Sequence, residues 1–436
     1  EPYRGLELLL LLGSFVWLVP PWGAAAVRLH PYDASKLAVL ASEWGNFNGS
    51  DTWQRREVDC HAMEGIRCDR DGHVTAIVLE DFELGAPIPD TISHFQRLTY
   101  LRLYFCQITG TIPSSISNLA SLVLLVLGGN SISGSLPASI SRLTRLQMLT
   151  LDFNRMSGPI DSICNLTQLR KLNLAQNRFN GSIPSSVGNL ALEGLDISVN
   201  QLSGSIPDSL SRLQEVTYIA LAENQLTGSI PESLAALNGL HGLYLHNNQL
   251  SGSIPASLAS LQNLEYLFFD INSLLGSIPA SLGDLLQLKY IHLQGNGFSG
   301  PVDYIVRTMK RIESLNLNHN LFSGRLPSPA SSGILEYKMN SNFFTHGNVK
   351  FNCSAAEWSV DLNCLSTDLL ICGRVPSSRS PAACAAFCGM EAGSTASVCE
   401  GHGYCSVNQF TGGGECVCDP NYLLDSTNTN VCLPGD

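Results

Sequence analysis

The sequence predicts an α/β solenoid, a stack of similar coils whose strands form one parallel sheet. Three observations predict it. A glycine recurs every 23 or 24 residues from Gly110 to Gly324, and an asparagine follows nearly the same period from Asn130 to Asn342. Within each copy, apolar residues alternate as they do in a strand with one buried face. Because one coil cannot bury its own apolar face, the coils must stack on one another.

Each position of the repeat has a physical role. The shared pattern is L-x-x-L-x-L-x-x-N-x-L-S/T-G-x-I-P-x-S-L-x-x-L, and the asparagine position marks twelve copies. The alternating leucines, such as Leu243 and Leu245, form the inner core. The asparagine amide both donates and accepts hydrogen bonds, so it can satisfy backbone groups that water does not reach. Glycine allows a tight bend, and Ile-Pro an extended segment. Phe82 and Cys106 replace the asparagine in the first two copies, and we interpret Cys106 as a structural thiol.

The pattern resembles the plant-type leucine-rich repeat, whose signature is the L-S/T-G-x-I-P segment. The resemblance covers residues 74–345 and implies a right-handed superhelix with a concave parallel sheet. The segment "TWQRREVDCHAMEGIRCD" resembles the N-terminal cap of such proteins, with Met63 in place of the usual tryptophan, and implies a Cys60–Cys68 disulfide. We assign the N-terminal cap to residues 27–73, where "DASKLAVLASEWG" has helical spacing. We assign the C-terminal cap to residues 346–364, closed by Cys353 and Cys364.

Residues 388–432 form a second, cysteine-rich module that resembles an epidermal-growth-factor-like (EGF-like) domain, joined by a linker at residues 365–387. Spacing alone leaves fifteen ways to pair six cysteines. The resemblance implies the pairs Cys388–Cys405, Cys399–Cys416 and Cys418–Cys432. Cys372 and Cys384 are left to pair with each other. The acidic stretch that would prepare a calcium site is absent, so we expect no calcium. Cys106 and Cys164 are then free buried thiols.

Residues 1–26 are typical of a signal peptide. The apolar run from Leu8 to Val19 is shorter than the roughly 20 residues of a membrane helix, and Ala24 to Ala26 provide a cleavage site. Fourteen cysteines and four glycosylation sequons fit the same compartment. The sequons lie at Asn48, Asn165, Asn180 and Asn352. We therefore expect a secreted or cell-surface protein with no membrane span in this chain.

Composition excludes several functions. The net charge is −12, and no run of lysine or arginine offers a phosphate-binding footprint, which argues against nucleic acid and anionic membranes as partners. The chain has no nucleophile elbow, no HExxH segment and no glycine-rich phosphate loop. We expect no enzymatic activity.

A candidate binding site follows from the residues that flank the buried leucines. These residues point away from the core and align in columns about 4.8 Å apart from coil to coil. In most copies these residues are small or polar. In the adjacent coils between Tyr218 and His292, they include aromatic residues, histidines and an aspartate. The predicted ligand-binding residues are Tyr218, Tyr244, His246, Tyr266, Phe268, Asp270, Tyr290 and His292. Exposed aromatic groups are enriched in binding surfaces.

The same residues allow other interpretations. Aromatic residues also stabilise sheets by cross-strand pairing. His246, Asp270 and His292 lack a close-spaced ligand motif, so we expect no metal and no cofactor. A smaller cluster, formed by Tyr100, Arg102, Tyr104 and Phe105, is expected to pack against the N-terminal cap.

The resemblance to plant-type repeat receptors implies a peptide, protein or cell-wall-derived glycan as ligand, with a co-receptor as a further partner. The chain is thus expected to be a recognition protein of the kind found as a receptor ectodomain. It is also similar to polygalacturonase-inhibiting proteins, which implies inhibition of wall-degrading hydrolases as an alternative. A structural matrix protein is a third interpretation.

Overall fold

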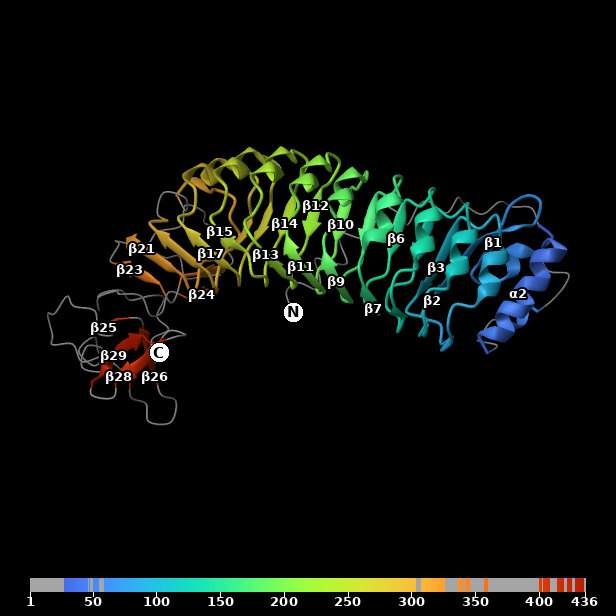
Figure 1. Ribbon diagram of the computed structural model, residues 1–436, viewed down its shortest axis with the longest axis horizontal. Helices are drawn as coiled ribbons and strands as arrows, with labels where there is room; N and C mark the ends of the chain where they lie inside the picture. The colour runs from blue at the N-terminus through green and yellow to red at the C-terminus, as the bar shows by residue number, and fades with distance from the viewer. Residues whose placement is uncertain are drawn as a thin grey trace.

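A computed structural model describes residues 27–325, apart from residues 46, 48–49, 55–58 and 303–306. It also describes residues 336–339, 342–345 and 357–359, and the backbone of short strands between residues 400 and 434. The repeats form one curved stack, with helix α2 (Pro31–Glu43) at its N-terminal end (Figure 1). The predicted solenoid of leucine-rich repeats is confirmed.

One long sheet runs through the whole stack and is parallel after its first strand. Its strands, in spatial order, are β1 (Ile66–Cys68), β2 (Val74–Glu80), β3 (Tyr100–Tyr104), β4 (Leu124–Val126), β6 (Met148–Thr150), β8 (Lys171–Asn173), β10 (Gly194–Asp196), β12 (Tyr218–Ala220), β14 (Gly242–Tyr244), β16 (Tyr266–Phe268), β18 (Tyr290–His292), β20 (Ser314–Asn316), β22 (Glu336–Lys338) and β24 (Glu357–Ser359). The sheet therefore extends past the repeats, into both segments that we assigned as caps.

The core lies between this sheet and the outer side of the coils. Equivalent leucines of successive strands are paired in register, as Leu243 is with Leu267. Both are at most 1% exposed. Their stacking repeats in each coil, so a single apolar core runs along the molecule.

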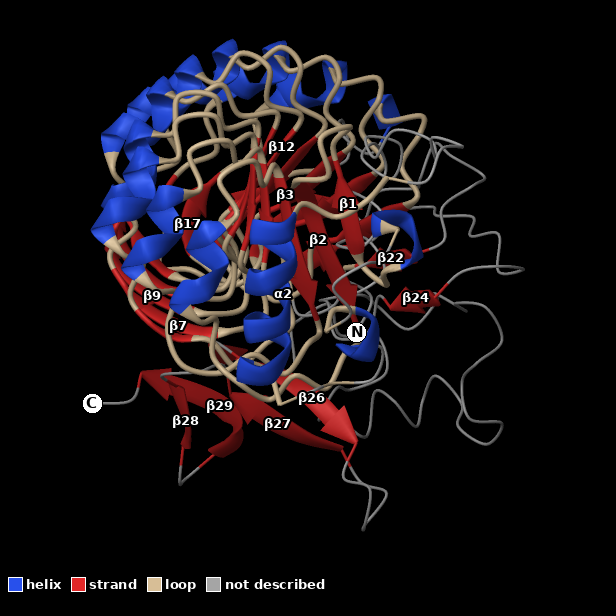
Figure 2. Ribbon diagram, turned by 90° about the vertical axis from the view of Figure 1, so that its right-hand side faces the viewer, coloured by secondary structure: helices blue, strands red, loops and turns tan. Residues whose placement is uncertain are grey.

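Between residues 90 and 284, the outer side of the coils is built from single 3-10 turns rather than α-helices, which corrects the α/β description for those repeats (Figure 2). These turns are η3 (Asp90–His94), η4 (Ser114–Asn118), η5 (Ala138–Arg142), η6 (Asp161–Asn165), η7 (Ser185–Asn189), η8 (Asp208–Arg212), η9 (Glu232–Ala236), η10 (Ala256–Ser260) and η11 (Ala280–Asp284). Each spans five residues, and most begin directly after a proline, as η9 does after Pro231. A segment this short cannot offset the cost of nucleating an α-helix.

Short strands line one flank of the coils and carry the glycine bend. They are β5 (Ser133–Gly134), β7 (Arg155–Gly158), β9 (Arg178–Ser182), β11 (Gln201–Ser205), β13 (Gln225–Thr227), β15 (Ser251–Gly252), β17 (Ser273–Gly276), β19 (Gly297–Gly300), β21 (Leu321–Arg325) and β23 (Phe343–Thr345). Gly228, next to β13, has φ +78°, which an L side chain rarely adopts. The repeating glycine thus supplies a left-handed bend, as predicted.

The asparagines form a ladder beneath the sheet. Asn224 donates through Nδ2 to the carbonyl oxygens of Ile197, Leu221 and Ala222, and its Oδ1 accepts from the Leu202 N–H. The preceding residue, Glu223, has φ +53°, which turns the chain inward. The Asn224 side chain thereby joins its own coil to the preceding coil.

Cys106 fills the asparagine position of its coil and acts as a weaker donor. Its Sγ lies 3.3 Å from the Leu79 carbonyl oxygen and 3.4 Å from that of Tyr104. Burial raises the pKa of its thiol to about 11, so the thiolate is scarce at neutral pH. Cys106 and Cys164 are free cysteines in the described part of the chain, but Cys164 is only partly buried.

The N-terminal end is closed by α2 and by the antiparallel pair β1–β2. Leu37 and Leu40 of α2 are fully buried, and Cys60 is bonded to Cys68. No helix among the described residues is long and apolar enough to span a membrane.

Several predicted features lie outside the described residues or side chains. They are the signal peptide at residues 1–26, the sequons at Asn48 and Asn352, and the remaining predicted disulfide cysteines, Cys353, Cys364, Cys372, Cys384, Cys388, Cys399, Cys405, Cys416, Cys418 and Cys432. The other two sequon asparagines, Asn165 and Asn180, are exposed. Near the C-terminus, the backbone forms β25 (Glu400–Gly401), β26 (Gly403–Val407), β27 (Gly414–Cys418), β28 (Tyr422–Asp425) and β29 (Asn428–Pro434).

Candidate functional site

The sheet brings all eight predicted ligand-binding residues together on four adjacent coils, those of β12, β14, β16 and β18. Tyr244 is paired with Phe268, and Phe268 with His292, so these three form one column as predicted. Tyr266 and Tyr290 are paired in the neighbouring column. We call the set Tyr218, Tyr244, His246, Tyr266, Phe268, Asp270, Tyr290 and His292 the concave cluster.

The rings of the concave cluster contact one another. Phe268 stacks on His292 with ring centroids 4.4 Å apart and meets Tyr244 edge-on at 5.2 Å. Tyr266 and Tyr290 stack at 5.0 Å with an angle of 6° between their planes. Such contacts contribute about 0.5–1.5 kcal/mol per pair beyond the area that they bury. The cluster is therefore a cohesive platform as well as a set of separate side chains.

The expectation that these side chains point into solvent is wrong for most of them. Phe268 is 2% exposed and Tyr244 is 9% exposed, and Tyr218, His246 and Asp270 are also buried. Tyr266, Tyr290 and His292 are partly exposed. The reason is the close spacing of the strands, because a large side chain on one strand lies against its neighbours instead of standing free.

Two glycines of the sheet strands, Gly194 and Gly242, provide space for the tyrosine rings. A Cβ built on Gly194 would lie 2.3 Å from the Tyr218 hydroxyl oxygen. A Cβ on Gly242 would lie 2.6 Å from the Tyr244 ring. A glycine is unusual as the first residue of a sheet strand in this chain, so the sequence did mark both positions. Which ring fills the space depends on how the tyrosine side chains turn, and the sequence does not show that.

Buried polar atoms gather around the cluster. The hydroxyl oxygens of Tyr218 and Tyr244, Oδ1 of Asp270 and Oε1 of Gln294 have no hydrogen-bond partner among the protein atoms described. A buried polar atom without a partner costs about 1–3 kcal/mol. Such atoms are retained where water or a ligand can satisfy them. The concave cluster therefore offers unused hydrogen-bonding capacity next to apolar ring surface.

Burial also changes the charge of the cluster. Burial raises the pKa of Asp270 to about 7 and, together with the nearby His292, lowers that of His246 to about 4. The pKa of Tyr290 is raised, first by its hydrogen bond to Glu313 and then by burial. Near neutral pH the His246 ring is thus uncharged, and Asp270 is divided between its neutral and anionic forms.

Asp270 predicts a pH-dependent stability. Its folded pKa lies above that of an unfolded aspartate, so the folded state binds more protons between about pH 4 and 7, and stability falls as pH rises through that window. Relative to Asp270→Asn, the wild-type chain should lose a few kcal/mol between pH 5 and 8, at roughly 1.4 kcal/mol per pKa unit. Urea denaturation of both proteins at several pH values measures the difference. Parallel curves would show that Asp270 titrates normally.

The smaller N-terminal cluster is held within its own coils. Arg102 forms an ion pair with Glu80 and lies 4.9 Å from the Tyr104 ring centroid. Tyr104 meets Phe105 edge-on at 4.6 Å, and Phe105 is 46% exposed. These contacts hold the cluster together within the first coils, and Phe105 leaves some apolar surface open; packing against the cap stays a prediction.

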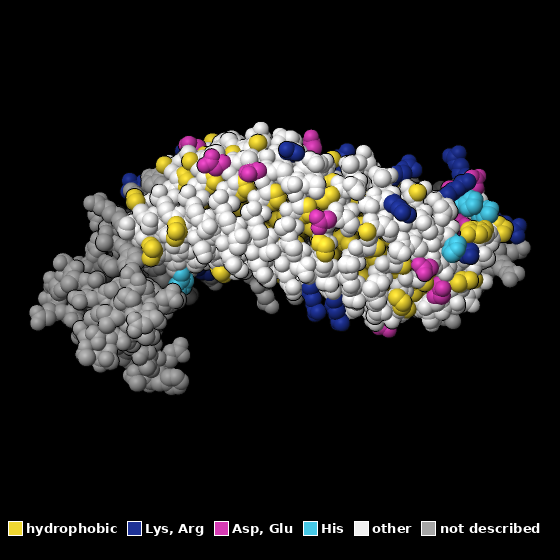
Figure 3. All heavy atoms as spheres, viewed as in Figure 1, with side chains coloured by type: hydrophobic (Ala, Val, Ile, Leu, Met, Phe, Trp, Pro, Cys, Tyr) yellow, Lys and Arg dark blue, Asp and Glu magenta, His cyan; other side chains and the backbone are white. Residues whose placement is uncertain are grey.

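Charged side chains do not gather into a second candidate binding surface on the face that Figure 3 shows. Figure 3 shows charged side chains that are sparse over the central coils and denser at the end occupied by α2. The group of metal-ligand residues that the described part of the chain brings together also lies at that end, not at His246, Asp270 and His292.

Comparisons with known proteins agree with the fold. Residues 96–156 match a family described as "Leucine rich repeat", and residues 168–190, 191–213 and 239–261 match a second family of the same description. No curated protein matched the chain. The described structure and these matches together establish the leucine-rich repeats.

Solved structures of plant receptor ectodomains are similar to the chain. The Arabidopsis receptor kinase HAESA, solved with the peptide hormone IDA and the co-receptor SERK1, is 31% identical with a TM-score of 0.66; the match covers 72% of this chain and 54% of HAESA. The plant peptide hormone receptor RGFR1, solved with RGF2, is 32% identical with a TM-score of 0.57, covering 60% and 42%. The chain thus spans about half or less of the length of these receptors.

A plant ice-binding protein is also similar, at 25% identity and a TM-score of 0.54, with 69% of this chain and 90% of that protein covered. The same repeat architecture thus serves proteins of different activity, so the function must be argued from the site.

Proposed function

We propose that this leucine-rich-repeat solenoid is an extracellular recognition protein that binds a peptide on its concave face, as a receptor-like ligand-binding ectodomain. The observation that carries the proposal is the concave cluster, where aromatic rings surround polar atoms that have no partner among the described residues. Large apolar side chains with available hydrogen-bonding groups are what binding hot spots combine.

The partly exposed edge of the cluster is the proposed contact surface. Tyr266 and Tyr290 present parallel rings there, and the Tyr290 hydroxyl donates to Glu313 at 2.5 Å. The rings offer apolar contact to a ligand side chain. The hydroxyls of Tyr218 and Tyr244 and Oδ1 of Asp270 are covered in this conformation, so they would hydrogen-bond a peptide backbone once side chains of the cluster rotate. Similar receptors solved with peptide hormones support a peptide as the ligand, and a co-receptor as a further partner.

The finer features predicted from the sequence belong to the same proposal. A signal peptide would direct the chain to the cell exterior, and the exposed Asn165 and Asn180 would carry glycans away from the concave columns. The EGF-like module at residues 388–432 would act as a spacer or a second contact.

Alanine substitutions at the exposed edge test the proposal. A panel of small secreted peptides is screened by calorimetry against the full chain, and the captured peptide is titrated into Tyr266→Ala and Tyr290→Ala variants. Each is expected to weaken binding by about 2 kcal/mol or more, roughly 30-fold, because hot-spot tyrosines contribute this much. Tyr100→Ala is the matched control, since Tyr100 occupies the same column near the other end of the sheet.

The same screen separates the other functions. Cell-wall fragments and fungal-type polygalacturonases are included beside the peptides. Inhibition of a hydrolase that is lost in Tyr290→Ala would favour an inhibitor of wall-degrading enzymes. Binding that all three variants retain would move the site away from the cluster. No soluble ligand together with firm retention in the cell-wall matrix would favour a structural role.

A further inference from the structure

The N-terminal cap contains a group of side chains that neither the repeats nor the concave cluster explains. His30, Asp33 and His73 each offer a ligand atom, and the three atoms lie within 4.8 Å of one another. They come from segments about 40 residues apart in the sequence. His30 is the N-cap residue of α2, Asp33 lies in its first turn, and His73 lies in the turn between β1 and β2.

The backbone fixes this arrangement. The His30 N–H donates to the Gly72 carbonyl oxygen at 2.8 Å. A Cβ on Gly72 would lie 2.1 Å from the Arg28 carbonyl oxygen, so only glycine permits the approach. The Asp33 carboxylate accepts from the Val74 N–H at 2.7 Å. The turn is thereby held against the start of α2, and His73 is held beside His30.

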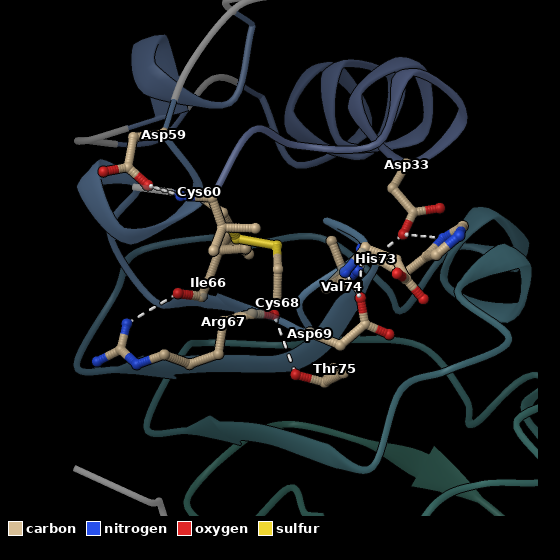
Figure 4. Close-up of a disulfide and its surroundings, with 12 residues drawn as sticks. Asp33, Asp59, Cys60, Ile66, Arg67, Cys68, Asp69, His73, Val74 and Thr75 are labelled. Carbon is tan, nitrogen blue, oxygen red and sulfur yellow. Dashed lines mark hydrogen bonds and ion pairs between the residues drawn. A yellow bond between two sulfur atoms is a disulfide. The ribbon is translucent and has the colours of Figure 1, made fainter. Parts of the chain in front are cut away.

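The orientation of the three side chains suits a cation. Figure 4 shows the Asp33 carboxylate directed from α2 toward His73, and Asp33 Oδ2 lies 3.3 Å from His73 Nδ1. These two atoms face each other, so both can be ligands of one cation bound between them. Nδ1 of His30 accepts from the Tyr32 N–H, so its Nε2 is the nitrogen left for a ligand bond.

Burial and ring packing give the same indication. The Asp33 side chain is 5% exposed, and its ion-pair partner among the described residues is His73, which is charged only when protonated. The His30 and His73 rings stack with centroids 4.0 Å apart. A bound dication would compensate the buried carboxylate of Asp33 beside the two imidazoles.

We propose that His30, Asp33 and His73 form a zinc site that fastens α2 to the β1–β2 turn. Two imidazole nitrogens and one carboxylate oxygen are a donor set that Zn²⁺ accepts, with water in the fourth position. Ligand atoms around tetrahedral Zn²⁺ lie about 3.3 Å apart for metal–ligand distances of about 2.0 Å. Asp33 Oδ2 and His73 Nδ1 already have that separation, and the His30 ring must turn out of its stack to bring Nε2 to the same ion. Calcium and magnesium prefer oxygen donors and are not expected to bind here.

The site would stabilise the end of the stack. Terminal coils lack one neighbour, and repeat proteins depend on caps to protect them. A cation shared by α2 and the β1–β2 turn would link the cap helix to the first strands of the long sheet.

Zinc titration of the full chain, purified without a polyhistidine tag and stripped with EDTA, tests the proposal. His73→Gln and His30→Asn are compared with the wild-type chain by isothermal titration calorimetry. Asparagine at position 30 keeps a good helix N-cap while it removes the imidazole. Each variant should bind one Zn²⁺ fewer per chain, or should bind zinc with a larger loss of affinity than the roughly 10–100-fold loss that follows removal of an outer-shell partner. His94→Gln is the control and should bind as the wild type does.

Hydrogen exchange of the wild-type chain supplies a second measurement that needs no variant. Zinc, but not magnesium, should slow exchange of the amides of residues 31–43 and 72–74. The proposal is overturned if zinc leaves this exchange unchanged, or if both variants bind zinc with wild-type affinity and stoichiometry. In either case the three residues serve only to cap α2 by hydrogen bonding.

Discussion

Replacing Asn224 with alanine is expected to destabilise the repeats by several kcal/mol. The Asn224 side chain is 8% exposed, and its amide serves three carbonyl oxygens and one N–H of two adjacent coils. An NH₂ group has two hydrogens, so these carbonyls share them. Alanine would leave buried backbone groups without a partner, at about 1–3 kcal/mol each. The loss is a large fraction of the roughly 5–15 kcal/mol that stabilises a typical protein.

Urea denaturation followed by circular dichroism measures this effect, and two variants bracket it. Gln225→Ala changes an exposed side chain on the next residue and should leave the denaturation midpoint nearly unchanged. Asn224→Cys copies the arrangement found at Cys106 and should recover part of the loss. A midpoint for Asn224→Ala equal to that of Gln225→Ala would mean that the ladder does not hold the coils together.

Replacing Phe269 with alanine is expected to cost about 3–5 kcal/mol, the range for deleting a large buried ring. Phe269 occupies a leucine position of the repeat and is fully buried in the main core. Its neighbour Phe268 faces the other side of the sheet and contacts Tyr244 and His292. Phe268→Ala should cost less, because the space it leaves adjoins the concave surface, and should also reduce ligand capture.

The pair of variants compares the same residue type on the two faces of one coil. Stability is read from denaturant midpoints, and binding from the peptide titration described above. Equal losses of stability, with binding retained by Phe268→Ala, would assign the concave cluster to sheet packing and not to recognition.

The repeat architecture was predictable because its determinants are local. The glycine and asparagine periods set where each coil bends, and the alternation of leucines sets which side chains enter the core. Those patterns also placed Tyr244, Phe268 and His292 in one column, which the strand register confirms. A regular repeat makes contacts between coils follow from positions within a coil, so long-range geometry could be deduced from a short pattern.

Exposure, turn type and contacts between distant segments were not predictable in this way. Phe268 is buried although its position faces away from the core, and the outer turns are 3-10 because five residues after a proline are too few for an α-helix. Gly194 provides space for a ring that comes from the next coil.

The sequence by itself thus determined the solenoid, the asparagine ladder and the columns of the concave face, since each depends on a periodic local pattern. Only the tertiary structure decided which concave side chains stay accessible, and that His30 and Asp33 meet His73, because those outcomes depend on how side chains from separate segments pack against one another.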